Sequence, residues 1–104
     1  MTDIPKRYQD FTKDYPDVAK HYEELGAAVH SAGPLNEKTR SLIKLAISTG
    51  ARLEGAVHSH TRKAIKSGAT NEELRQVALL SLPTIGFPSM MAALSWIDDI
   101  IERN

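Results

Sequence analysis

The segment from residue 52 to residue 62 combines imidazole, carboxylate and guanidinium side chains, which are groups that transfer protons or bind ligands. It holds two of the four histidines of the chain. At about 100° per residue, His60 falls near the middle of an arc that contains Leu53, Val57 and Ala64. An imidazole on an apolar face needs a hydrogen-bond partner and can have a shifted pKa. His60 is therefore a candidate general acid or base, although a core histidine with satisfied hydrogen bonds has the same spacing.

Glu54, His58 and Arg62 follow one another at intervals of four residues, which places them on a polar stripe beside that arc. His58 and His60 lie about 200° apart around the helix axis, so one metal ion cannot bind both from a straight helix. Glu54 and His58 could share a metal, but a catalytic zinc site needs three protein ligands and no third lies nearby in the sequence. We therefore assign no metal site from the sequence, and metal binding through Glu54 and His58 remains a third possibility. Glu54 and His58 remain candidate catalytic residues, with a solvated pair as the alternative.

Length and composition limit the classes of function. The chain has 104 residues, of which 41% are hydrophobic and 25% charged, so we expect residues 1–104 to form a single domain. Its 13 basic residues balance 13 acidic ones, which favours neither nucleic acid nor a membrane as a partner. No apolar run approaches a bilayer span, and no glycine-rich motif resembles a phosphate cradle. We expect a cytoplasmic protein without a cofactor.

The spacing of apolar residues predicts an all-α fold of about six helices. Pro5 suits the first turn of a helix, and Asn36 is a good N-cap. Thr70 and Glu73 form a capping box that starts the fifth expected helix, and Pro83 is expected to end that helix. The expected helices cover 5–13, 16–31, 36–50, 52–67 and 70–82, and a sixth, after the Gly-Phe-Pro at 86–88, carries an apolar stripe from Met90 to Ile101.

The fifth expected helix is apolar around most of its circumference. Leu74, Val77 and Leu82 line one face, and Leu79 and Leu80 extend the apolar surface beyond it. A helix of this kind needs burial on more than one side, which a small domain achieves most easily by oligomerising. We therefore expect copies of the chain to associate.

Four stretches of the chain carry a resemblance to a known family. They are the runs Lys38-Thr-Arg-Ser-Leu-Ile43, His60-Thr-Arg-Lys-Ala64 and Gly68-Ala-Thr-Asn-Glu-Glu-Leu74, and the Gly-Phe-Pro at 86–88. In order and spacing they resemble the carboxymuconolactone decarboxylase and alkylhydroperoxidase D-like family over residues 35–95. The resemblance implies an all-helical fold that assembles into homotrimers, or into homohexamers made from them.

The peroxidase branch of that family uses a Cys-x-x-Cys motif followed four residues later by histidine, and a glutamate in the preceding helix. Aligned on His60, the two cysteine positions hold Leu53 and Ala56, and the glutamate position holds Ser41. Because the chain contains no cysteine, dithiol peroxidase and disulfide reductase chemistry are not expected. Of this set only His60 remains, and Ser41 is a candidate site residue through its position.

The decarboxylase branch needs no thiol. Loss of carbon dioxide from a carboxylated lactone leaves an enolate-like carbanion that a general acid must protonate, and the resemblance implies this role for His60. Substrate carboxylates need a cation, for which Arg40, Arg52 and Arg62 are candidates. The resemblance therefore implies a decarboxylase-like lyase, or a binding protein, for a small carboxylated or lactone ligand.

A second interpretation is a non-catalytic oligomeric scaffold or binding module that keeps the family fold. His60 would then be a buried node of hydrogen bonds. The two interpretations differ in whether polar groups converge on His60, and Ser41, Ser48 and Ser59 are the nearby candidates in the sequence.

Overall fold

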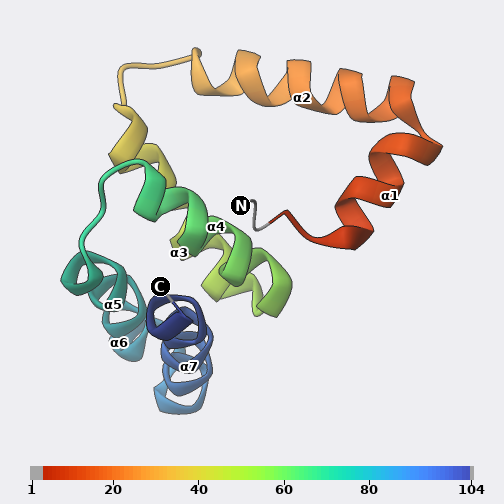
Figure 1. Cartoon of the computed structure of the whole chain (residues 1–104). Coiled ribbons are helices and arrows are strands. Elements are labelled where there is room, and N and C mark those ends of the chain that lie inside the picture. The colour runs from red at the N-terminus through yellow and green to blue at the C-terminus, as the bar shows by residue number, and fades with distance from the viewer. Residues whose placement is uncertain (1–3, 104) are drawn as a thin grey trace. The chain divides into compact units, whose positions relative to one another are not determined.

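Helices make up the regular structure of this protein in the computed structural model, which describes residues 4–103 (Figure 1). No strand occurs in that range, and every helix within it is too short or too polar to span a bilayer. The all-α class and the six expected helices are confirmed, and one further short helix is present. The assignment of residues 86–88 to a loop is wrong, because the last helix begins at Phe87, with Pro88 in its first turn, where the missing N–H of proline is tolerated. In chain order the helices are α1 (Lys6–Asp14), α2 (Pro16–His30), α3 (Glu37–Ala51), α4 (Glu54–Lys66), α5 (Asn71–Leu80), α6 (Leu82–Ile85) and α7 (Phe87–Arg103).

The chain divides into two compact units, one within Met1–Pro34 and the other within Leu35–Asn104. The first contains α1 and α2, which meet at Tyr15, and Pro16 occupies the first turn of α2 because its missing N–H is not needed there. The Tyr8 hydroxyl of α1 donates a hydrogen bond to Glu23 of α2 at 3.2 Å. The assignment of residues 1–104 to a single domain stays a prediction.

The second unit is built around a core to which four helices contribute. Leu45 of α3, Val57 of α4, Leu74 of α5 and Ile97 of α7 are all fully buried. In this unit α3 packs against α4, and α7 packs against both α4 and α5. Figure 1 shows α7 lying beside α5 and α4, which is the arrangement that brings their apolar stripes together.

The fourth helix begins two residues later than the sequence predicted, at Glu54 rather than residue 52. Gly50 stays helical, and Arg52 takes the left-handed conformation, with φ 59° and ψ 41°. Two hydrogen bonds compensate for this backbone strain: the N–H of Leu53 donates to the carbonyl of Ser48 at 3.2 Å, and the N–H of Arg52 donates to the carbonyl of Thr49 at 3.1 Å.

The caps around α5 are those that the sequence predicted, but the end of this helix differs. Thr70 and Glu73 form the reciprocal capping box. The assignment of Leu82 to α5 is wrong, because α5 ends at Leu80 and Leu82 starts α6. Pro83 lies in the first turn of α6, where its missing N–H leaves no hydrogen bond unmade.

Candidate functional site

The buried face of α4 determines which side chains flank it. Val57, Thr61 and Ala64 are fully buried, whereas Leu53 is 56% exposed. The Thr61 hydroxyl donates to the carbonyl of Val57 at 2.7 Å, which satisfies it inside the apolar core. The prediction that His60 lies at the centre of the inward arc is therefore wrong by one position. His60 lies beside that face and is only half-buried.

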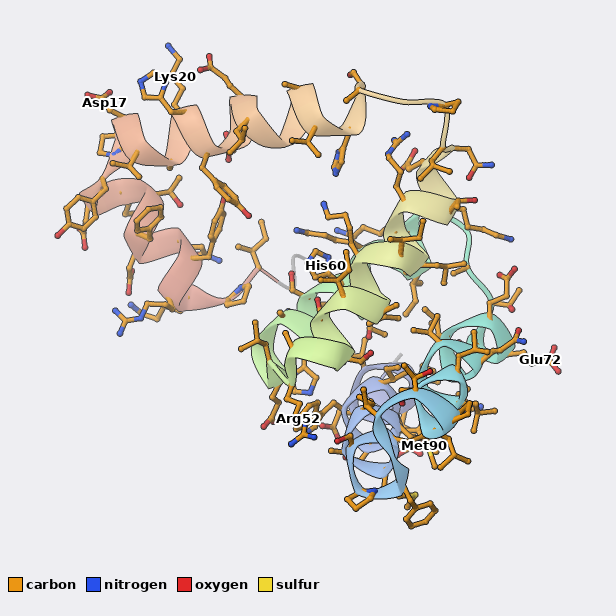
Figure 2. The ribbon with its side chains drawn as sticks, turned by 180° about the vertical axis from the view of Figure 1, so that it is seen from behind. Asp17, Lys20, Arg52, His60, Glu72 and Met90 are labelled. Atoms are coloured by element: carbon orange, nitrogen blue, oxygen red, sulfur yellow. The ribbon has the colours of Figure 1, made fainter. Side chains whose placement is uncertain are left out.

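The environment of His60 disfavours its protonated form. Burial lowers the pKa of His60 from 6.5 to about 4, and the positive charges of Lys63 and Lys44 add to this effect. Within residues 4–103, no side chain or backbone group forms a hydrogen bond with its imidazole ring. Figure 2 shows His60 on α4. At neutral pH this side chain is an uncharged imidazole beside two cations.

Three basic residues, Arg40 and Lys44 of α3 and Lys63 of α4, form what we call the basic cluster. Burial lowers the pKa of Lys44, and the charges of Lys63 and Arg40 lower it further. The cations predicted from the sequence to bind a ligand are all arginines, so neither lysine was among them. The position of Lys63, one turn after His60 on the same helix, was a signal available in the sequence.

Ser41, which occupies the position of the family glutamate, does not contact His60 through a hydrogen bond. Its hydroxyl oxygen lies 3.0 Å from that of Ser67, at the end of α4. The Ser67 hydroxyl in turn lies 3.1 Å from a carboxylate oxygen of Glu37. This chain of polar groups links the first turn of α3 to the end of α4.

The other two serines near His60 in the sequence do not converge on it either. Ser48 is buried and donates to the carbonyl of Lys44 in its own helix at 2.9 Å. Ser59 is half-buried and has no hydrogen bond to His60. Polar convergence on His60, which the scaffold interpretation requires, is absent from the part of the chain that the structure describes.

The three candidate arginines lie in different places. Arg40 donates from Nη1 to the carbonyl of Leu35 at 2.6 Å, which ties it to the segment before α3. Arg52 caps α3 about two helical turns before His60, and Figure 2 shows it near the α3–α4 connection. Arg62 is half-buried on α4. Among these, Arg40 is the arginine that belongs to the basic cluster.

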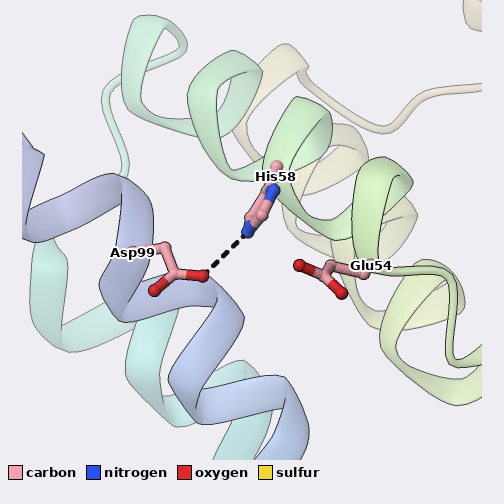
Figure 3. Close-up of side chains that lie close together, drawn as sticks. All are labelled: Glu54, His58 and Asp99. Atoms are coloured by element: carbon pink, nitrogen blue, oxygen red, sulfur yellow. Dashed lines mark hydrogen bonds and ion pairs between the residues drawn. The ribbon is translucent and has the colours of Figure 1, made fainter.

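His58 lies on a different side of α4 from His60, as expected, but it faces α7 rather than solvent alone. Its Nε2 lies 3.1 Å from Oδ2 of Asp99, and its side chain is 18% exposed (Figure 3). Glu54, His58 and Asp99 each offer one atom that could bind a metal, and these three atoms all lie within 4.8 Å of one another. Asp99 lies 41 residues from His58, so its place beside this histidine could not be predicted from local spacing in the sequence.

A separate open groove runs between α3 and α5. Its volume is about 350 Å³, and most of its surface is apolar. His60 is not among its lining residues, which are Thr39, Leu42, Ile43, Ala46, Glu73, Gln76, Val77 and Leu80.

Comparison with known proteins relates this chain to a family. The sequence profile of the Carboxymuconolactone decarboxylase family matches residues 16–99. An uncharacterized protein from Haemophilus influenzae is 35% identical over 61 residues, which make up 59% of this chain and 54% of that protein. This chain therefore spans about half the length of that curated relative.

A solved structure shares the fold over most of its length. It is the crystal structure of a carboxymuconolactone decarboxylase family protein from Legionella pneumophila in its apo form. The two chains are 27% identical, the match covers 93% of this chain and 87% of the other, and the TM-score is 0.80. This chain therefore has the same helical fold as that protein.

Proposed function

Because this chain belongs to the carboxymuconolactone decarboxylase family, we propose that it is a decarboxylase-like lyase acting on a small carboxylated or lactone-type molecule beside His60. The observation that supports this proposal is the state of His60, which is half-buried, has a pKa lowered to about 4 and has no hydrogen-bond partner in residues 4–103. A structural histidine in a core is held by hydrogen bonds. No described residue bonds the ring nitrogens of the half-buried His60, so a ligand can do so in this proposal.

The basic cluster supports an anionic ligand. The charges of Lys44 and Lys63 both act on His60, so a ligand carboxylate beside this histidine is attracted to the site. The negative charge of such a ligand opposes the lysines and raises the pKa of His60. Ligand binding and protonation of His60 therefore favour each other in this proposal.

The proposed reaction follows from that coupling. The bond between the substrate carbon and its carboxylate breaks, carbon dioxide leaves, and the bonding electron pair stays on the carbon as an enolate. His60, protonated once the anion is bound, donates its proton to that carbon and takes another from solvent. The basic cluster lowers the energy of the developing negative charge. No cysteine is available in the chain, so dithiol chemistry has no part in this reaction.

One observation favours the scaffold or binding module as a second candidate. Ser41 stands where the peroxidase branch has a glutamate, and its hydroxyl lies against Ser67 rather than His60. His60 consequently lacks an acidic partner from α3. Under this alternative, the protein binds a ligand at His60 but does not convert it to a product.

A thermal-shift screen with wild type and His60→Gln tests the proposed function. The compounds are lactones, keto acids and aromatic dicarboxylates. A compound that binds the native protein at about 100 times its Kd raises the free energy of unfolding by about 2.7 kcal/mol. We expect such a response in wild type and its loss in His60→Gln, while His21→Gln on the exposed surface of α2 keeps it.

Carbon dioxide release from each stabilising compound then separates the two candidates. Release by wild type and not by His60→Gln supports the lyase, and binding without release supports the binding module. If His60→Gln keeps both the ligand response and the turnover, the role proposed for His60 is wrong.

We further propose that the protein assembles as a homotrimer or homohexamer through an apolar patch on the second unit. The patch consists of residues along α5, α6 and the start of α7 that are between 36% and 61% exposed. A surface of contiguous apolar side chains is typical of protein interfaces. Its members are Leu79, Leu80, Leu82, Ile85 and Phe87.

Leu80→Glu is expected to reduce the mass of the assembly toward that of the 11.5 kDa chain. Leu80 is 61% exposed, so the substitution leaves the core intact but places a charge that an interface would bury without a partner. Light scattering coupled to size exclusion measures the mass. Ser95→Glu, which adds the same charge at an exposed position of α7, should leave the assembly unchanged. A monomeric wild type, or equal masses for wild type and Leu80→Glu, contradicts the proposal.

A further inference from the structure

Glu54, His58 and Asp99 present three ligand atoms to one space between α4 and α7. These atoms all lie within 4.8 Å of one another, and Nε2 of His58 lies 3.1 Å from Oδ2 of Asp99. Figure 3 shows the three side chains directed toward the same region, two from α4 and one from α7. Imidazole nitrogen and carboxylate oxygen are ligands of divalent transition metals.

The fold holds two of these side chains in place through their neighbours in the core. Val57 precedes His58 on α4, Ile97 lies two residues before Asp99 on α7, and both apolar residues are fully buried in one cluster. The backbones that carry His58 and Asp99 are therefore fixed relative to each other within the second unit. Glu54 lies one turn before His58, and its exposed side chain is free to rotate toward the pair.

Among the side chains that the structure describes, no lysine or arginine pairs with this group. In the part of the chain that the structure describes, neither Glu54 nor Asp99 forms an ion pair with lysine or arginine, and Asp99 pairs only with His58. The adjacent Asp98 differs, because it binds Nε of Arg75 at 2.9 Å. Two carboxylates, those of Glu54 and Asp99, share the space, and a divalent cation offsets negative charge there.

One ligand-to-ligand distance already fits a metal site, and the exposed side chain of Glu54 can move to bring the third ligand closer. Ligands at about 2.1 Å from a metal lie about 3.0 to 3.4 Å apart at octahedral or tetrahedral angles. The 3.1 Å between His58 and Asp99 falls in this range without any movement. We propose that Glu54, His58 and Asp99 bind a divalent transition-metal cation such as Zn²⁺, with the remaining coordination positions open to water. This site lies on a different side of α4 from His60 and does not depend on the proposed lyase function.

Calorimetric titration with ZnCl₂ tests the site directly. The protein is the full chain, purified without a histidine tag and stripped of metal with a chelator. We expect one Zn²⁺ to bind per chain. Loss of an outer-shell partner costs about 10- to 100-fold in metal affinity, so loss of a ligand in His58→Gln or Asp99→Asn should cost at least that much.

Two further variants keep the test decisive. Glu54→Gln changes an exposed side chain, so weaker zinc binding by this folded variant cannot result from unfolding. His21→Gln removes one member of the exposed His21–Glu24 pair, whose atoms are 3.3 Å apart but which lacks a third ligand, and should not change the affinity. The proposal is overturned if wild type binds no zinc, if Glu54→Gln binds as wild type does, or if His60→Gln or His21→Gln loses the binding.

Discussion

Replacing Ile97 with alanine is expected to lower the free energy of unfolding by about 2 to 5 kcal/mol. Ile97 of α7 is fully buried against Leu45, Val57 and Leu74, so its loss leaves a cavity where four helices meet. Close-packed helices cannot all move to fill such a space. Trp96 is the single tryptophan and packs against the same core, so its fluorescence during urea unfolding measures the stability of this unit.

The matched control is Ile47→Ala on α3. Ile47 is 65% exposed, and the same truncation there should change the free energy of unfolding by no more than about 0.5 kcal/mol. Equal losses for the two variants would show that Ile97 does not lie at the centre of the core. Both variants replace isoleucine with alanine, so the difference between their stabilities reports the difference in burial between the two sites.

Acidification from pH 7 to pH 4 is expected to destabilise wild type by on the order of 2 kcal/mol more than it destabilises His60→Gln. The pKa of His60 is about 4 in the folded protein and 6.5 without the fold, so in this window the unfolded chain binds a proton that the folded chain does not. Stability therefore rises with pH across the window and reaches its full value above pH 6.5. The full shift corresponds to about 3 kcal/mol, which partial solvent exposure reduces.

Urea unfolding of both proteins at pH 7, 6, 5 and 4 measures this difference. His21→Gln, which removes an exposed histidine from α2, should follow wild type. Parallel curves for wild type and His60→Gln would mean that His60 titrates alike in the folded and unfolded chains. An NMR titration of the imidazole protons gives the pKa of His60 independently of stability.

The pH result also bears on the proposed chemistry. A histidine with a pKa of about 4 is a poor proton donor at pH 7 because almost none of it is protonated. The proposed coupling requires an anionic ligand to raise that pKa. Repeating the titration with a stabilising carboxylate from the screen should therefore move the pKa of His60 upward.

Much of the helical structure follows from local signals in the sequence. The side chain of Asn36 accepts from the N–H of Thr39 at 2.9 Å, and Thr70 and Glu73 form their capping box, as their residue types predicted. Such caps act within one turn, so a single sequence contains all the information they need. The lack of cysteine was equally clear from the sequence, which therefore supplies no thiol of its own whatever the fold.

The inward face of α4 could not be predicted from residue polarity. Thr61 is polar by type but fully buried, because its hydroxyl bonds to the carbonyl of Val57 one turn earlier. Leu53 is apolar by type but largely exposed. Which residues a helix buries depends on the helices that pack against it as well as on its own pattern.

The two candidate sites needed the tertiary structure for the same reason. Lys44 reaches the environment of His60 from α3, and Asp99 reaches His58 from α7, 41 residues away. The sequence alone determined that His58 and His60 lie on different sides of one helix. Only the packing of α3 and α7 against α4 decided that one histidine lies beside cations and the other beside a carboxylate, because charges act through space and not along the chain.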